Sequence, residues 1–126
     1  MNTSLVNQNA VVMTGKELFR YVSAQKQGLI SVRDDGNTYR KQLGTDWVLH
    51  LTKKSDVTLK DWLDGKKIFL SKLLPWQLGE VDFPTQSVVE RWILDGVCES
   101  VTGERVEPDG YSYDGAPSWL LVFGLL

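Results

Sequence analysis

The strongest constraint on the fold of this 126-residue chain is a turn flanked by two segments that favour β-strands. The turn, Asp34-Asp35-Gly36-Asn37, combines side chains that hydrogen-bond to the nearby backbone with a glycine that tolerates positive φ. Residues 29–33 before it are rich in Ile and Val, and residues 38–43 after it can return as a partner strand. The sequence therefore predicts a β-hairpin at this place.

Two further segments read as strands. Residues 47–52 alternate between larger and smaller side chains, so one side would carry Trp47, Leu49 and Leu51, and the other Val48, His50 and Thr52. Residues 66–74 are largely apolar and stop at Pro75, which has no N–H for a ladder. We therefore predict a third strand over 47–52 and another over 66–74.

A capping box predicts a helix before the hairpin. Thr14 and Glu17 have the T-x-x-E spacing in which each side chain satisfies a backbone N–H at a helix start. Leu18, Phe19 and Val22 would share one face of this helix. We predict a helix over residues 15–27, ended by Gly28.

Two more helices are predicted in the second half of the chain. Thr58 repeats the capping pattern with Asp61 and predicts a short helix over 59–64. Another helix would open at residues 84–85, or at Ser87 with Glu90, and continue to Leu94. An alternating strand over these last residues is the alternative.

Together these segments predict an α+β fold, with two or three helices on one face of a mainly antiparallel sheet of three to five strands. Residues 13–126 would form a single domain, and residues 1–12 a flexible N-terminus. Residues 96–126 are dense in Gly, Pro, Asp and Ser and end in W-L-L-V-F-G-L-L. We expect a turn-rich segment whose apolar end closes the core, although self-association through that end stays open.

Composition excludes several classes of protein. Cys98 is the only cysteine, so the chain can form no intrachain disulfide and no cysteine-based zinc site. No segment approaches the ~20 apolar residues of a membrane span. We expect a cytoplasmic protein that makes no membrane contact.

Charge is distributed unevenly along the chain. The net charge is −2, but residues 1–78 hold twelve Lys and Arg against seven Asp and Glu, while residues 79–126 hold two against nine. The two parts can neutralise one another within one fold, or either can face a charged partner.

Signals of catalysis are weak. His50 is the only histidine and has no accompanying nucleophile signature, so we interpret it as a surface or structural residue. Cys98 lies beside Glu99, which would not activate a thiol. No glycine-rich phosphate loop is present. We predict no catalytic residues, no metal and no cofactor.

A group of cationic and aromatic residues around the hairpin is the strongest candidate for a binding site. Its members are Arg33, Tyr39, Arg40, Lys41, Trp47, Lys53 and Lys54. Cations interleaved with aromatics on a sheet can contact phosphates and stack on bases. The alternative is that the aromatics are core residues and the cations protect a solvated sheet edge.

The C-terminal quarter resembles the tail of a group of short, uncharacterised proteins of phages and other mobile elements. The shared runs are W-I-L-D-G at 92–96, V-E-P-D-G at 106–110, G-A-P-S-W-L-L at 115–121 and G-L-L at 124–126. The group's usual pattern, D-G-C-x-V-E-P-D-G-x-C-x-H-G-x-P-S-W-L-L-x-x-G-L, carries Cys and His where this chain has Glu104, Ser112 and Asp114. The resemblance implies a phage or mobile-element origin, but no metal is carried over.

Three functions follow from these features. The first is a non-enzymatic phage or mobile-element accessory protein that binds and inhibits a host protein, such as a defence nuclease. The second is a small nucleic-acid-binding module that uses the basic and aromatic hairpin region. The third is a nucleotide-binding or sequestering protein in which Trp47, Trp62, Trp76 or Trp92 stacks on the ligand.

Overall fold

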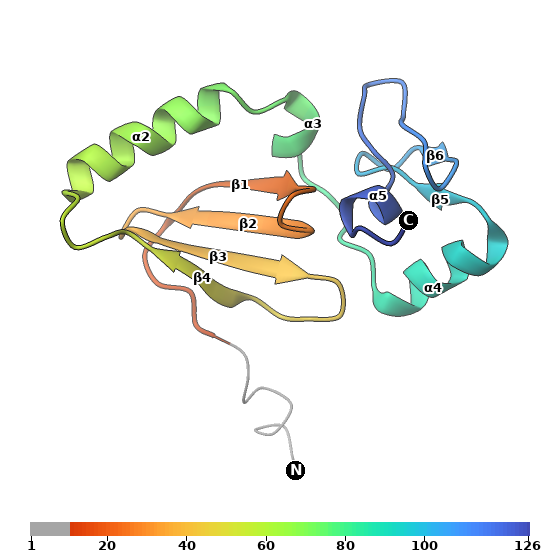
Figure 1. Cartoon of the computed structure of the whole chain (residues 1–126), viewed down its shortest axis with the longest axis horizontal. Coiled ribbons are helices and arrows are strands. Elements are labelled where there is room, and N and C mark those ends of the chain that lie inside the picture. The colour runs from red at the N-terminus through yellow and green to blue at the C-terminus, as the bar shows by residue number, and fades with distance from the viewer. Residues whose placement is uncertain (1–10) are drawn as a thin grey trace, which may run out of the picture.

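The computed structural model describes residues 11–126 and shows an α+β fold built on a four-stranded antiparallel sheet (Figure 1). The strands follow chain order and span Glu17–Ser23 (β1), Gly28–Arg33 (β2), Asn37–Gln42 (β3) and Val48–Thr52 (β4). The helices span Leu59–Ser71 (α2), Pro75–Leu78 (α3), Gln86–Asp95 (α4) and Trp119–Val122 (α5). A second sheet pairs Cys98–Glu99 (β5) with Arg105–Val106 (β6). The predicted fold class is confirmed. Of the flexible N-terminus predicted over residues 1–12, residues 1–10 lie outside the described residues.

The predicted hairpin is confirmed as β2 and β3. The backbone N–H of Asn37 donates to the Asp35 carboxylate (3.1 Å), and Gly36 adopts a φ of 93°. These are the two contributions expected from the turn residues.

The third predicted strand is confirmed as β4, but its predicted sides are wrong. Leu49 pairs with Tyr39 and Leu51 with Thr38, which leaves His50 as an extra residue in a β-bulge. Neighbouring residues of β3 point to opposite sides, so Leu49 and Leu51 also lie on opposite sides. The alternation in the sequence contained no sign of this bulge.

The helix predicted over residues 15–27 is wrong, because this segment forms β1. Its Phe19, Tyr21 and Val22 pair with β2, and aromatic and β-branched residues suit a pleated surface. Thr14 caps no helix and bonds the Tyr39 hydroxyl instead (3.1 Å). The Glu17 carboxylate accepts a hydrogen bond from the Ser31 hydroxyl across the sheet. Pairing with β2 therefore overrides the local capping pattern.

Gly28 begins β2 and does not end a helix. A Cβ atom at this position would lie 2.0 Å from the Lys41 carbonyl oxygen on β3. The close approach of the two strands therefore requires glycine.

Helix α2 is longer than predicted, and the strand predicted over residues 66–74 is wrong. Thr58 caps the helix as expected, accepting from the Asp61 N–H (3.1 Å). Gly65 does not end the helix, because the apolar spacing of Trp62, Phe69 and Leu70 continues past it. In residues 11–126 no helix is long and apolar enough to cross a membrane.

The predicted helix near residues 84–94 is confirmed as α4. The Thr85 hydroxyl accepts from the Val88 N–H (3.3 Å), and Gly96 ends the helix in the left-handed conformation. This is the expected cap at each end.

The two sides of the four-stranded sheet have different coverings. Helix α2 lies over the side that carries Phe19 and Tyr21, and the Phe69 ring is 5.1 Å from that of Tyr21. We call this the helix side of the sheet. Residues of the other side, Val22 and Leu29, join the C-terminal segment in the main core.

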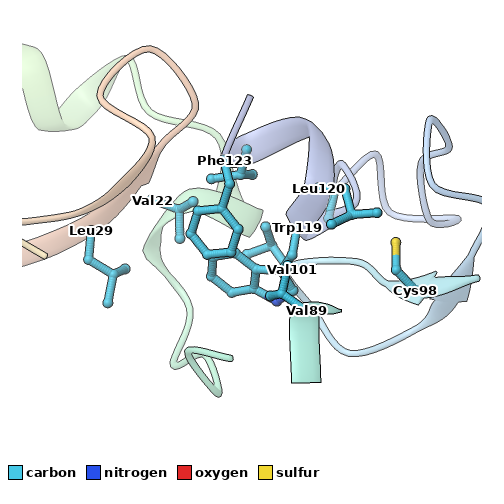
Figure 2. Close-up of a cluster of buried hydrophobic side chains, with 10 residues drawn as sticks. Val22, Leu29, Val89, Cys98, Val101, Trp119, Leu120 and Phe123 are labelled. Carbon is cyan, nitrogen blue, oxygen red and sulfur yellow. The ribbon is translucent and has the colours of Figure 1, made fainter. Parts of the chain in front are cut away.

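The main core gathers around the C-terminal apolar run, as Figure 2 shows. Trp119 is only 2% exposed, and its ring stacks on that of Phe123 at 5.4 Å. Val89 of α4 and Cys98 of β5 complete the cluster from the same half of the chain. The expectation that the terminal run closes the core is confirmed for residues 119–123, whereas Leu125 and Leu126 are exposed.

Candidate anion-binding groove between helix α2 and the sheet

The structure divides the predicted basic and aromatic residues between two sides of the sheet. Arg33 and Tyr39 lie on the side opposite α2 and hold the segment before β1. The Arg33 guanidinium donates to the carbonyl oxygens of Thr14 (2.9 Å) and Gly15 (2.7 Å), and the Tyr39 hydroxyl bonds Thr14. Tyr39 is 3% exposed. These two residues therefore serve the fold and are not available to a ligand.

Lys41 and Trp47 each take part in a cation–π contact. The Lys41 ammonium lies 5.4 Å from the centre of the Phe83 ring, and the Arg20 guanidinium lies 4.8 Å from that of Trp47. Trp47 also packs against the main core. These cation–π contacts occupy both residues on the side away from α2.

Arg40 lies on the helix side of the sheet, where it meets His50. One guanidinium nitrogen, Nη1, is 3.3 Å from His50 Nδ1. A guanidinium only donates, so Nδ1 is the acceptor in this contact. The Nε atom of Arg40 is buried and has no hydrogen-bond partner in the described chain. Buried donors are nearly always paired, so this atom carries a desolvation cost.

Lys66 approaches the same region from α2. Its ammonium lies 5.4 Å from the centre of the Trp62 ring and 5.7 Å from that of Phe69, one helical turn to either side. Burial lowers the pKa of Lys66. A half-buried ammonium held by two rings thus faces the sheet.

The charges of these groups act on His50. Partial burial lowers its pKa, and the positive charges of Lys26, Arg40 and Lys66 lower it further. In residues 11–126 the ion pairs within 4.0 Å are Arg20–Glu17, Arg33–Glu17 and Lys60–Asp64. No carboxylate therefore neutralises Arg40 or Lys66, and clustered like charges of this kind are typical of functional sites.

A recess of about 280 Å³ opens beside this cluster, between the end of β4 and α2. Its apolar wall comprises Leu51, Val57 and Trp62, and three ammonium-bearing residues border it: Lys53, Lys54 and Lys66. The Lys53 N–H donates to the Gly36 carbonyl (2.8 Å), which ties the start of this loop to the hairpin turn. We call the recess the Trp62 slot, and the slot together with its three lysines the basic groove.

The basic groove can hold anionic groups and flat apolar groups, because ammonium side chains border an apolar wall. Among the described residues no set of three or more His, Cys, Asp or Glu is placed to hold a metal ion. Cys98 lies in the main core, where burial raises the pKa of its thiol. The groove is thus suited to binding.

The three positions at which the resembling group carries Cys and His lie near one another in the C-terminal segment. The Ser112 hydroxyl and the Thr102 hydroxyl donate to the Asp114 carboxylate, and the Tyr113 N–H donates to Glu104 (3.3 Å). The hydrogen bonds from Ser112 and Thr102 lower the pKa of Asp114. Here hydrogen bonds connect the turns of this segment.

Of the predicted site residues, the structure brings Lys53 and Lys54 to the basic groove, while Arg40 lies on the same side of the sheet against His50. Sequence reasoning assigned no role there to Lys66, because the residue was placed in a strand, and it treated His50 as structural. Trp62 was named only as one of four tryptophans that can stack on a ligand. The i, i+4 spacing of Trp62 and Lys66 was the available signal, since it places both on one helix face.

Comparisons of this chain with models of protein families, with curated proteins and with solved structures each find no match.

Proposed function

We propose that this protein is a nucleic-acid-binding module that contacts its ligand through the basic groove. The observation that supports this most directly is the Trp62 slot, in which Lys53, Lys54 and Lys66 surround an apolar wall that includes Trp62. Anionic oxygens at the slot would accept hydrogen bonds from these ammonium groups and offset their clustered positive charge.

The arrangement of charge favours a polyanion over a single ion. Lys53 and Lys54 extend the positive surface from the cluster along the end of β4, and both border the Trp62 slot. The part of the chain that forms the sheet, α2 and α3 is also the basic part, residues 1–78. A phosphate backbone supplies regularly spaced negative charges to such a surface.

The test is the salt dependence of binding to a fluorescent oligonucleotide. Replacing Lys53 and Lys54 by Ala would reduce the slope of log affinity against log salt concentration by about 2, since each lysine contributes about one phosphate contact. The control is Lys60→Ala with Lys72→Ala, which removes the same charge from α2 and its C-cap, outside the slot; the Lys60 side chain is 83% exposed and paired with Asp64. Equal slopes for the two double variants, or no binding by the parent protein, would reject the proposal.

The acidic C-terminal half supports a second candidate, inhibition of a host protein by binding. None of the ion pairs in residues 11–126 involves a residue after 78, so the carboxylates of this half lack cationic partners within 4.0 Å. Glu80, Asp82 and Glu99 line one cavity of about 320 Å³. Such a surface can present phosphate-like charge to a basic partner, such as a nuclease of the host.

This second candidate is tested by mass spectrometry of proteins that co-elute with a tagged copy from a bacterial host. A stoichiometric partner that is lost in the Glu80→Gln, Asp82→Asn, Glu99→Gln variant, and kept in the Lys53→Ala, Lys54→Ala variant, would support it. A clean preparation that carries nucleic acid would favour the first proposal instead.

A further inference from the structure

The Trp62 slot combines two kinds of surface within one recess. Leu51, Val57 and Trp62 form an apolar wall, and the Thr38 side chain and three lysines supply polar and charged groups around it. A ligand that matches both must carry a flat apolar part and an anionic part next to each other. A nucleotide unit has this chemistry, with a base that stacks on aromatic rings and a phosphate that binds cations.

Lys66 lines the slot beside Trp62, with its ammonium 5.4 Å from the centre of the Trp62 ring. A cation therefore lies next to the position for a base. Lys53 and Lys54 border the same recess, so a phosphate that adjoins this base would meet three ammonium groups.

The shape of the slot discriminates between forms of nucleic acid. It is a recess between a helix and the end of a strand, with a volume of about 280 Å³. The bases of a duplex are stacked and paired inside the helix and cannot enter a recess unless they are flipped out. Unpaired bases of a single strand can be splayed onto an aromatic side chain without that cost.

We propose that the basic groove binds single-stranded nucleic acid, with one unpaired base in the Trp62 slot and an adjoining phosphate at Lys53, Lys54 and Lys66. This inference rests on the proposed nucleic-acid binding and adds the form of the ligand and the position of a base.

The experiment compares a single-stranded oligothymidine, a duplex of the same length and thymidine monophosphate, each titrated against the parent protein, Trp62→Leu and Trp62→Phe. Binding is followed by fluorescence polarisation of labelled oligonucleotides and by quenching of tryptophan fluorescence. Trp62→Leu should weaken single-strand binding roughly 5-fold to 150-fold, the loss expected for one stacked base, while duplex binding stays unchanged. Trp62→Phe, which keeps an aromatic ring, should restore part of the affinity.

Two controls separate a failure of this inference from a failure of the proposed function. Phe69→Leu changes the ring on the other side of Lys66, which does not line the slot, and should leave the preference for single strands intact. Thermal melting of each variant shows whether it is folded, and Lys53→Ala with Lys54→Ala tests the slot without changing its aromatic wall.

Each outcome decides between the alternatives. Salt-dependent binding with equal affinity for the single strand and the duplex, unaffected by Trp62→Leu, would overturn the base slot and leave nucleic-acid binding in place. Quenching by the monophosphate with no gain for the oligonucleotide would overturn it in favour of a free nucleotide. The absence of binding to all three ligands would reject both proposals.

Discussion

The two halves of this molecule are held together in different ways. The C-terminal half surrounds Trp119, Leu120 and Val122, which are almost completely buried. Helix α2, in contrast, spans 13 residues and buries none of them fully. It contacts the sheet through the Phe69 ring, which packs on the rings of Phe19 and Tyr21. The C-terminal half is packed for stability. The half that contains α2 leaves cations and an aromatic ring accessible beside a groove, as binding regions of low local stability often do.

The largest expected difference between the halves is in the free energy of unfolding that is lost when a tryptophan is replaced. Trp119→Ala should lower the free energy of unfolding by about 3–5 kcal/mol, because it empties the centre of a packed core. Trp62→Ala on α2 should cost about 1–2 kcal/mol, since its ring is already partly in water. Denaturation by guanidinium followed by circular dichroism measures both. Equal losses would show that α2 is as tightly packed as the core.

Gly28→Ala at the start of β2 should lower the free energy of unfolding by a smaller amount. The added Cβ meets the Lys41 carbonyl at 2.0 Å, so β2 and β3 must separate locally at a cost of about 1–3 kcal/mol. Gly79→Ala is the control, because a Cβ there meets nothing within 4 Å and its φ is not positive. If the two alanine variants unfold at the same denaturant concentration, the sheet adapts more easily than this contact indicates.

Gly65→Ala should stabilise helix α2, which is less tightly packed than the main core. Gly65 lies in the interior of α2 with open space around it, so alanine should raise stability by about 0.5–1 kcal/mol. Amide hydrogen exchange should slow in α2 and stay unchanged in α4. Nucleic-acid affinity should stay the same, since Gly65 does not line the Trp62 slot. Loss of binding in this variant would indicate that the groove needs a flexible helix.

The smallest effect is a pH dependence from His50. Burial and the charges of Lys26, Arg40 and Lys66 hold the pKa of His50 below its ordinary value, so the folded state prefers the neutral ring. The stability from this preference is complete above the ordinary pKa of about 6.5 and is lost as the pH falls through the window down to the lowered value.

Binding should respond to pH in the opposite sense. A protonated His50 adds positive charge to the side of the sheet that faces α2, so affinity for a polyanion should rise as the pH falls through the lowered pKa of His50. His50→Gln should flatten both profiles while keeping the affinity measured above pH 7. Unchanged profiles in this variant would show that another group titrates.

Sequence reasoning identified the parts of the fold that depend on local chemistry. The hairpin at residues 34–37 and the caps at Thr58 and Thr85 use side chains that bond to the backbone two or three residues away. Such bonds can be read from a short stretch of sequence. The burial of the C-terminal run also followed from its composition.

The errors arose where distant contacts decide the structure. Thr14 and Glu17 have the spacing of a capping box, but the residues that follow pair with β2 and form a strand. The Thr14 hydroxyl bonds Tyr39 instead of capping a helix. The same applies to Lys66, which became a groove residue only because α2 continues through Gly65. The meeting of Arg40 with His50 depends on the bulge in β4, and no local signal marks it.

The composition of the main core has a consequence for folding during synthesis. Val22 and Leu29, on the first two strands, complete their burial against Trp119 and Phe123 (Figure 2). On the ribosome the sheet can pair as soon as β4 has emerged, but this side of it stays uncovered while some seventy further residues are made. Exposed apolar surface on a nascent sheet invites aggregation and chaperone binding. The yield of folded protein should therefore depend on how quickly translation passes from Thr52 to Phe123.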